Sequence, residues 1–227
     1  MPDRCCRAGA TGTLDMPPKP IKYDLHPSVE QIQGWIATLP DKTGRSLDQW
    51  MAFIRKAGHA DEKAARAWLK GEHGLGTNTA WWLCERAFAR DLSMMDDDPD
   101  RYMAMAPKYV AGQYAGKKEA LRPIYARLVS MARRQGKDVK VCPCKTMVPF
   151  YRAHVFANVK PTTTTRVDLG LCLTPLVKAG KKLPARLVAT GGYEKKDRIT
   201  HRVALAGVGE IDEFVEKWLG KAYELDG

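Results

Sequence analysis

The sequence predicts an α+β protein: an N-terminal four-helix, bundle-like domain, then a C-terminal antiparallel sheet covered by helices on one face. Two observations carry this prediction. Apolar residues recur at helical spacing over 28–92, whereas from residue 150 the apolar period changes to two. A last helical stripe follows the alternating segments. Helices that cover one face of antiparallel strands define the α+β class.

The N-terminal domain is expected to contain four short helices. They are expected from Ser28 to Pro40, from Ser46 to Gly58, over 61–73, and from Thr77 onward. Ser and Asp favour helix starts, whereas Gly and Pro favour helix ends. Five tryptophans fall in these helices. Large aromatic rings in so small a domain predict an aromatic core.

Two segments flank this domain and are expected to lack regular structure. Residues 1–27 form the expected flexible tail, because the first 26 of them hold four prolines and show little periodicity. Residues 93–106 include Asp96, Asp97 and Asp98 and predict an acidic linker. A metal site there is disfavoured, because consecutive side chains diverge and the calcium-loop spacing is missing.

The C-terminal domain is expected over 107–227. A helical pattern covers 109–136, with Pro123 tolerable only near a helix start or as a kink. Strands are expected over 150–160 and 166–173 as a hairpin, then on both sides of Gly191-Gly192. The last helix is expected over 210–225.

The charge is concentrated in the predicted sheet. The chain has a net charge of +11, and residues 139–206 hold thirteen Lys and Arg against three Asp and Glu. Such asymmetry favours an anionic partner. Alternation places bases and aromatic rings on one outward surface, which suits phosphate contacts with base stacking and predicts DNA or RNA as the partner. The candidate residues are Lys145, Arg152, His154, Phe156, Lys160, Arg166, Lys195, Lys196 and Arg198. The alternative is a merely soluble basic surface, with Phe150 and Phe156 buried under a helix.

A second candidate lies between two predicted helices, at Gly74, Gly76, Thr77 and Asn78. The pattern resembles the hairpin of helix-hairpin-helix modules, where glycines let the backbone approach a phosphate. The simpler interpretation is a Gly helix end followed by a Thr77 N-cap.

A third candidate is the pair Cys142 and Cys144, which lie on one side of an extended segment and could join Cys172 or His154 as metal ligands. The spacing is not that of a zinc site, and packing of reduced thiols is favoured. We therefore expect no metal and no cofactor. No GxSxG, P-loop or GxGxxG pattern occurs, so no reaction is predicted. No apolar run reaches the length of a membrane span, so we expect a soluble, cytoplasmic protein without a membrane partner.

Both halves resemble uncharacterised domains. The N-terminal half is similar to a bacterial helical domain of unknown function, through Ile32-Gln33-Gly34-Trp35, Thr43-Gly44-Arg45-Ser46, Trp68-Leu69-Lys70 and His73-Gly74-Leu75-Gly76. The C-terminal half resembles a domain also found appended to restriction-endonuclease-like proteins, through Tyr109-Val110, Leu121 to Tyr125, Val139-Lys140-Val141, Phe156-Ala157 and Lys160-Pro161. The second resemblance favours nucleic acid by analogy only.

The sequence thus predicts a non-enzymatic nucleic-acid-binding module. One alternative is a domain that binds a small anion or metabolite, with or without enzymatic activity, in a pocket near His154. Lys145, Tyr151, Arg152 and Lys195 would line that pocket with it. A second alternative is a thiol or metal carrier that uses Cys142 and Cys144.

Overall fold

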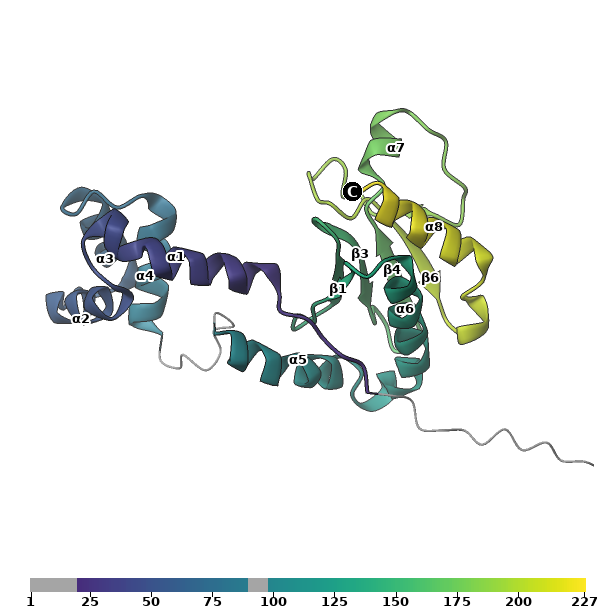
Figure 1. Ribbon diagram of the computed structural model, residues 1–227, viewed down its shortest axis with the longest axis horizontal. Coiled ribbons are helices and arrows are strands. Elements are labelled where there is room, and N and C mark those ends of the chain that lie inside the picture. Colours follow the sequence, from purple (N-terminus) through teal and green to yellow (C-terminus); the bar gives the residue numbers. More distant parts are fainter. Residues whose placement is uncertain (1–19, 90–97) are drawn as a thin grey trace, which may run out of the picture.

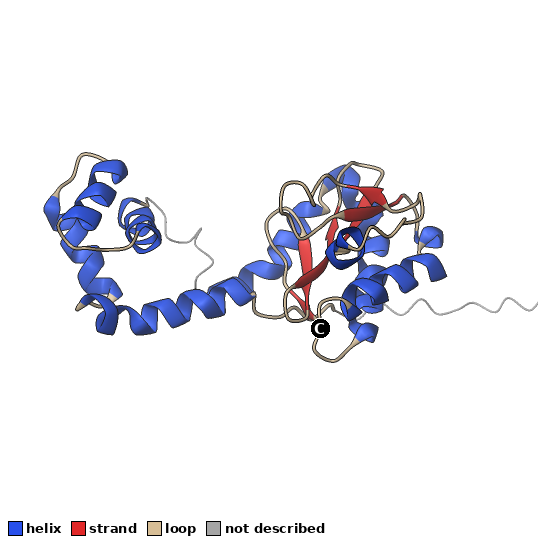
Figure 2. Cartoon of the chain, turned by 90° about the horizontal axis from the view of Figure 1, so that it is seen from above, coloured by secondary structure: helices blue, strands red, loops and turns tan. Residues whose placement is uncertain are grey.

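The computed structural model describes residues 20–89 and 98–227 and has the α+β architecture that the sequence predicts. Figure 1 shows a helical N-terminal part, a C-terminal part that contains the sheet, and the helices α1 and α5 between them. Figure 2 shows all strands gathered in the C-terminal part. The N-terminal helices are α1 (Pro27–Thr43), α2 (Leu47–Ala57), α3 (Glu62–Gly71) and α4 (Thr77–Phe88).

Local signals in the sequence explain the ends of α2 and α3. Ser46 forms a capping box with Gln49 at the start of α2, and the side chain of Asp61 caps α3. The expected stop at Pro40 is wrong, because α1 continues to Thr43 with Pro40 inside it. Gly44 ends the helix instead, with a φ of 74° and an N–H that donates to the carbonyl of Pro40.

Only some of the tryptophans form the core of this bundle. Trp50 and Trp82 are buried, together with Ile54, Leu69 and Leu83. Trp35 and Trp81, which the sequence also assigns to the core, are 42% and 46% exposed. A short helix has room to bury only one stripe of side chains, so two of the rings stay at the surface.

Both flanking segments carry more structure than the sequence predicts. Residues 20–26 were expected in the tail, yet Ile21 and Tyr23 pack against the C-terminal core and the Asp24 N–H donates to the Val141 carbonyl at 3.0 Å. Residues 99–106 were expected in the linker and instead open α5 (Pro99–Gln113). The side chain of Asp98 caps that helix by accepting from the Arg101 N–H. Residues 1–19 and 90–97, which complete the expected tail and linker, lie outside the described residues.

The C-terminal part is an antiparallel sheet of six strands in the order β1-β2-β3-β4-β6-β5. The strands are β1 (Lys140–Val141), β2 (Val148–Tyr151), β3 (Val155–Lys160), β4 (Val167–Leu171), β5 (Val188–Ala189) and β6 (His201–Leu205). The other elements are the 3-10 helices η2 (Gly116–Leu121) and η3 (Val208–Glu210), and the helices α6 (Arg122–Gln135), α7 (Thr174–Lys178) and α8 (Glu213–Glu224). The predicted hairpin is confirmed as the β3–β4 pair, and the strands around Gly191-Gly192 as β5 and β6.

Helices α6 and α8 lie over one face of the sheet (Figure 1). Pro123 stands in the first turn of α6, where its missing N–H has no helical partner to lose. The apolar stripe of α8 includes Val215 and Leu219, and both side chains are buried in the main core. Strand residues such as Leu169 and Val203 complete this core from the sheet side.

The segment over 150–160 is not one continuous strand. A tight turn at residues 152–154 separates β2 from β3, and Phe150 pairs with Ala157 while Tyr151 pairs with Val155. Phe156 is therefore an extra residue in β3, a bulge that breaks the alternation. Both Phe156 and Ala157 are fully buried, and the Phe156 ring centroid lies 5.6 Å from that of Tyr223 in α8. The predicted outward position of Phe156 is thus wrong.

Candidate nucleic-acid interface

The two faces of the sheet differ sharply in polarity. Val159, Val167, Leu169, Leu171, Val203 and Leu205 face the helices, and all are fully buried. Their neighbours along the strands face the other way because strand side chains alternate. We call this second surface the open sheet face; its residues are Asn158, Lys160, Arg166, Asp168, Arg202 and Ala204. Lys160 and Ala204 are exposed, so solvent reaches both sides of this face.

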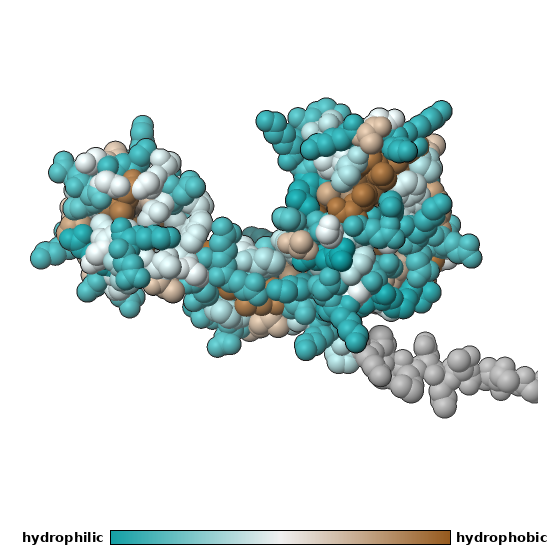
Figure 3. Space-filling view, turned by 45° about the horizontal axis from the view of Figure 1, so that its top comes forward, coloured by the Kyte–Doolittle hydropathy of each residue, from teal (hydrophilic) through white to brown (hydrophobic). Residues whose placement is uncertain are grey.

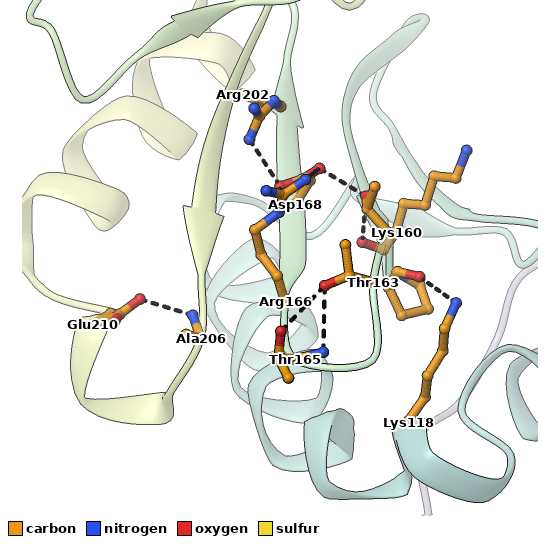
Figure 4. Close-up of polar contacts among 11 residues, drawn as sticks. Lys118, Lys160, Thr163, Thr165, Arg166, Asp168, Arg202, Ala206 and Glu210 are labelled. Atoms are coloured by element: carbon orange, nitrogen blue, oxygen red, sulfur yellow. Dashed lines mark hydrogen bonds and ion pairs between the residues drawn. The ribbon is translucent and has the colours of Figure 1, made fainter.

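One carboxylate holds two arginines on the open sheet face (Figure 4). Arg166 Nε and Arg202 Nη1 each lie 3.0 Å from Asp168 Oδ1. The Thr162 hydroxyl donates to the other oxygen of Asp168 at 2.7 Å. The side chain of Asp168 is 12% exposed, whereas those of Arg166 and Arg202 are 35% and 28% exposed. The carboxylate is therefore the buried anchor and the two guanidinium groups lie nearer solvent.

This arrangement leaves an excess of positive charge. Two guanidinium groups share one carboxylate, and Lys160 pairs with Asp168 across the β3–β4 ladder. Three cations thus lie on this face with one anion. Each guanidinium has five N–H donors and spends only one or two on Asp168, so both retain donors for an added anion. Guanidinium groups with spare parallel donors suit phosphate oxygens.

The turn between β3 and β4 is fixed beside these cations. The ammonium group of Lys118 in η2 donates to the carbonyl of Pro161 at 2.7 Å, and the hydroxyls of Thr163 and Thr165 lie 3.4 Å apart (Figure 4). These contacts tie the hairpin end to η2. The backbone next to Arg166 therefore has a fixed conformation before any ligand binds.

Arg152, His154 and Arg198 gather elsewhere. His154 precedes β3 and Lys160 ends it, so about 20 Å of strand separates them, at roughly 3.3 Å per residue. Asp226 is the centre of this second group. Its carboxylate lies 2.6 Å from Arg198 Nη2 and accepts the backbone N–H of His154 at 2.7 Å.

Arg152 is held by α8 and by Asp138. Its Nε lies 3.0 Å from Asp138 Oδ2, and its guanidinium stands 4.4 Å from the ring centroid of Tyr223. The hydrogen bond from the Tyr223 hydroxyl, and after it that from Arg152, lower the pKa of the Asp138 carboxyl. In this second group each arginine is paired with a carboxylate, Arg152 with Asp138 and Arg198 with Asp226. The contacts hold the end of α8 against the β2–β3 turn.

The remaining predicted bases do not join either group. Lys145 lies between β1 and β2, and Lys195 and Lys196 lie in the loop before β6. All three are exposed, and within residues 20–89 and 98–227 no carboxylate lies within ion-pair distance of their ammonium groups. They add charge around the sheet without forming a common site with Arg166.

The Gly74 hairpin lacks the Thr77 cap that the simpler interpretation of its sequence predicts. Gly74 has a φ of 62° and ends the preceding turn, but the N-cap of α4 is Gly76, not Thr77, and no side chain caps the helix. Asn78 and Thr79 line a hollow of about 130 Å³ together with Lys42 and Trp82. The uncapped helix start and one lysine thus lie together, as the phosphate-binding interpretation requires.

Thr77→Ala should therefore change the free energy of unfolding by less than about 0.5 kcal/mol, since the lost hydroxyl caps nothing. Urea denaturation of both proteins measures this. Ser46→Ala, which removes a real cap, is the matched control and should cost about 1 kcal/mol. A loss as large for Thr77→Ala as for Ser46→Ala contradicts this assignment.

The cysteines behave as packed thiols. Cys142 is fully buried and its thiol lies 3.5 Å from the carbonyl of Leu25, while burial raises its pKa to about 12. A thiol with so high a pKa stays protonated at neutral pH and is a poor nucleophile and metal ligand. Over 20–89 and 98–227, no three His, Cys, Asp or Glu side chains are grouped to hold a metal ion.

The sequence prediction missed Arg202 and the anchoring role of Asp168. A signal for Arg202 was available, because it alternates with Val203 and Leu205 in β6 and must face away from the core. The convergence of both arginines on Asp168 depends on the β4–β6 register, which pairs Gly170 with Arg202. The strand pattern alone does not give that register.

Two models of protein families match the chain. The model of the domain of unknown function DUF4287 matches residues 32–86, and that of the domain of unknown function DUF5655 matches residues 110–226. No curated protein and no solved structure matches the chain. Among the described residues, no helix is both long and apolar enough to cross a membrane. Because the second match covers just over half of its length, the chain belongs to the DUF5655 family.

Proposed function

We propose that this protein is a non-enzymatic module that binds DNA or RNA through the open sheet face. The observation that carries the proposal is the pair of guanidinium groups, Arg166 and Arg202, on the single carboxylate of Asp168. Lys160 stands next to them in the register. A surface with several cations and few anions attracts a polyanion and holds it by its phosphates.

The shape of this surface favours a polymer over a small anion. Lys160 lies on β3, Arg166 just before β4 and Arg202 on β6, and both Lys160 and Ala204 are exposed. An open sheet can follow an extended phosphate backbone, whereas tight binding of a small anion requires a concave site. Exposed Lys145, Lys195 and Lys196 extend the positive field around the sheet.

Two further features agree with this proposal. The uncapped start of α4, beside Lys42, offers backbone N–H groups to a phosphate, as in helix-hairpin-helix modules. The C-terminal half also resembles a domain appended to restriction-endonuclease-like proteins, which act on nucleic acid. As a protein that binds nucleic acid, it would act in the cytoplasm of a bacterium.

The alternative pocket near His154 has less support. Arg152 and Arg198 are committed to Asp138 and Asp226, and the side chain of His154 is 65% exposed. The alternative carrier role also has less support, because burial keeps Cys142 protonated. We therefore keep nucleic acid as the single proposed ligand class.

Two substitutions on the open sheet face test the proposal, one that removes a positive charge and one that removes a negative charge. Arg202→Gln should weaken binding of a fluorescein-labelled oligonucleotide about threefold to tenfold and reduce the salt slope by about 0.7–0.9, the effect of one lost phosphate contact. Asp168→Asn adds one net positive charge at the same place and should strengthen binding. Lys56→Gln is the control, because it removes one exposed positive charge from α2, and it should alter the affinity by less than about twofold.

Fluorescence anisotropy titrations at 50 and 200 mM salt measure the affinity and the salt slope of the three variants. Circular dichroism verifies that each is folded, since Asp168→Asn leaves two guanidinium groups side by side. Equal affinities for Arg202→Gln, Asp168→Asn and the unaltered chain contradict the open sheet face as the binding surface.

A further inference from the structure

A second site lies beside the sheet. A hollow of about 400 Å³ opens between the segment that follows α7 and the β5–β6 hairpin. Its volume is that of a small-molecule site. Val177, Leu183 and Leu187 form an apolar wall, and Tyr193, Glu194 and His201 contribute from the hairpin. Figure 3 shows hydrophobic residues at the surface of the C-terminal part, in the region where α7 lies in Figure 1.

The loop that carries Tyr193 is held in a defined shape. The Thr190 hydroxyl donates to the carbonyl of Ile199 at 2.7 Å, and the N–H of Asp197 donates to the carbonyl of Gly192 at 2.8 Å. A Cβ atom at Gly192 would lie 2.1 Å from that Ile199 carbonyl oxygen, so only glycine fits there. The ring of Tyr193 is 40% exposed at the edge of the hollow.

Lys196 in the same loop is strained. It has a φ of 57°, and among the described residues it is the only non-glycine residue with a positive φ. A lysine in the left-handed region costs about 1 kcal/mol, and such residues concentrate at binding sites. Its N–H donates to the carbonyl of Tyr193 at 3.1 Å, which ties the strained residue to the backbone of Tyr193.

His201 supplies a polar edge to the hollow. Its Nδ1 lies 3.1 Å from the hydroxyl of Thr200, which also accepts the N–H of Leu173. Burial lowers the pKa of His201, with the charge of Glu194 acting in the opposite direction. The imidazole is therefore neutral at pH 7, and when the Thr200 hydroxyl donates to Nδ1, Nε2–H remains to donate to a ligand.

The two segments that border the hollow are rich in lysine. Lys181 lines the hollow, Lys178 and Lys182 lie in the same segment, and Lys195 and Lys196 follow Glu194 in the loop; all five are exposed and are called the rim lysines. Glu194 and Asp197 are the only acids in residues 174–201. A ligand that fits these features has a flat apolar ring, a hydrogen-bonding edge and a negative charge outside the hollow.

We propose that this hollow binds one nucleotide unit, with its base against Tyr193 and the apolar wall and its phosphate among the rim lysines. The inference rests on the proposed function in one respect, that the nucleotide belongs to a single-stranded nucleic acid which also lies on the open sheet face. A free nucleotide has the same chemistry and is the other source. In a duplex the base is paired and stacked, so the hollow selects single strands.

The test uses the full chain, a fluorescein-labelled ten-nucleotide single strand, the matching duplex, and AMP and UMP as competitors. Tyr193→Ala should weaken binding of the single strand about tenfold, as expected for one lost stacking contact, and should change duplex binding less than about twofold. Tyr193→Phe keeps the ring and should bind the single strand as the unaltered chain does. Arg202→Gln, measured alongside, should weaken the binding of both oligonucleotides.

The outcomes separate this site from the open sheet face. If Tyr193→Ala binds the single strand like the unaltered chain, the nucleotide site is overturned while the proposed function can stand. If AMP or UMP binds, Tyr193→Ala abolishes that binding and neither oligonucleotide binds, the site holds a free nucleotide and the proposed function fails. Absence of binding to oligonucleotides, AMP and UMP alike overturns both proposals.

Discussion

Phe156→Ala should lower the free energy of unfolding by about 3–5 kcal/mol, the usual cost of removing a buried aromatic ring. The ring is fully buried and its centroid lies 6.3 Å from that of Phe150 and 5.6 Å from that of Tyr223. Removing it leaves a cavity between β2, β3 and α8. Urea denaturation followed by circular dichroism measures the loss.

Phe88→Ala is the matched control for this change. Phe88 is 37% exposed at the end of α4, so its loss should cost less than half as much. Where Phe156→Ala remains folded, at low denaturant, its affinity for nucleic acid should match that of the unaltered chain. A small loss of stability together with a large loss of affinity would contradict the buried position of Phe156 and would support the base-stacking role that the sequence predicts.

Asp226→Ala should lower the free energy of unfolding by about 2–3 kcal/mol. The substitution leaves the backbone N–H of His154 and the guanidinium of Arg198 without the carboxylate that accepts their hydrogen bonds. The side chain of Asp226 is 1% exposed, and it holds His154 and Arg198 to the end of α8. The side chain of Arg198 is 46% exposed and becomes hydrated when Asp226 is lost, so the expected loss is smaller than the usual cost of breaking a fully buried ion pair.

Asp226→Asn separates the two parts of this contact. The amide oxygen still accepts from the His154 N–H, whereas the charge that Arg198 pairs with is gone. We expect a loss between zero and that of Asp226→Ala, measured by the same urea titration. Equal stability of Asp226→Ala and the unaltered chain contradicts the structural role of this residue.

The sequence predicts the fold best where local signals act alone. Capping residues and apolar stripes give the ends of α2 to within one residue, those of α3 to within two and those of α8 to within three. The sequence fails where tertiary contacts decide. The sequence places residues 20–26 in a flexible tail, but the carboxylate of Asp24 accepts the backbone N–H of Val141 and pairs with Arg133, which joins this segment to the sheet domain. Pro40 sits in the last turn of α1, where Gly44 can close the helix.

The candidate site is predicted in part for the same reason. Alternation correctly places Lys160 and Arg166 on the surface opposite the core. It fails at Phe156 because a bulge shifts the register by one residue, and it fails at Arg152 and His154 because a turn ends the strand before them. The hollow at Tyr193 and His201 joins elements whose contact no periodic pattern encodes.

The salt dependence of nucleic-acid binding tests the central claim most directly. The measurement is an anisotropy titration of the full chain against a labelled single strand at 50 and 200 mM salt. With Lys160, Arg166 and Arg202 each holding a phosphate, the affinity should fall with a logarithmic slope of about −2, at roughly −0.7 per contact on single strands. Binding that is unchanged between the two salt concentrations, or no binding at 50 mM, contradicts the claim that the open sheet face holds a polyanion.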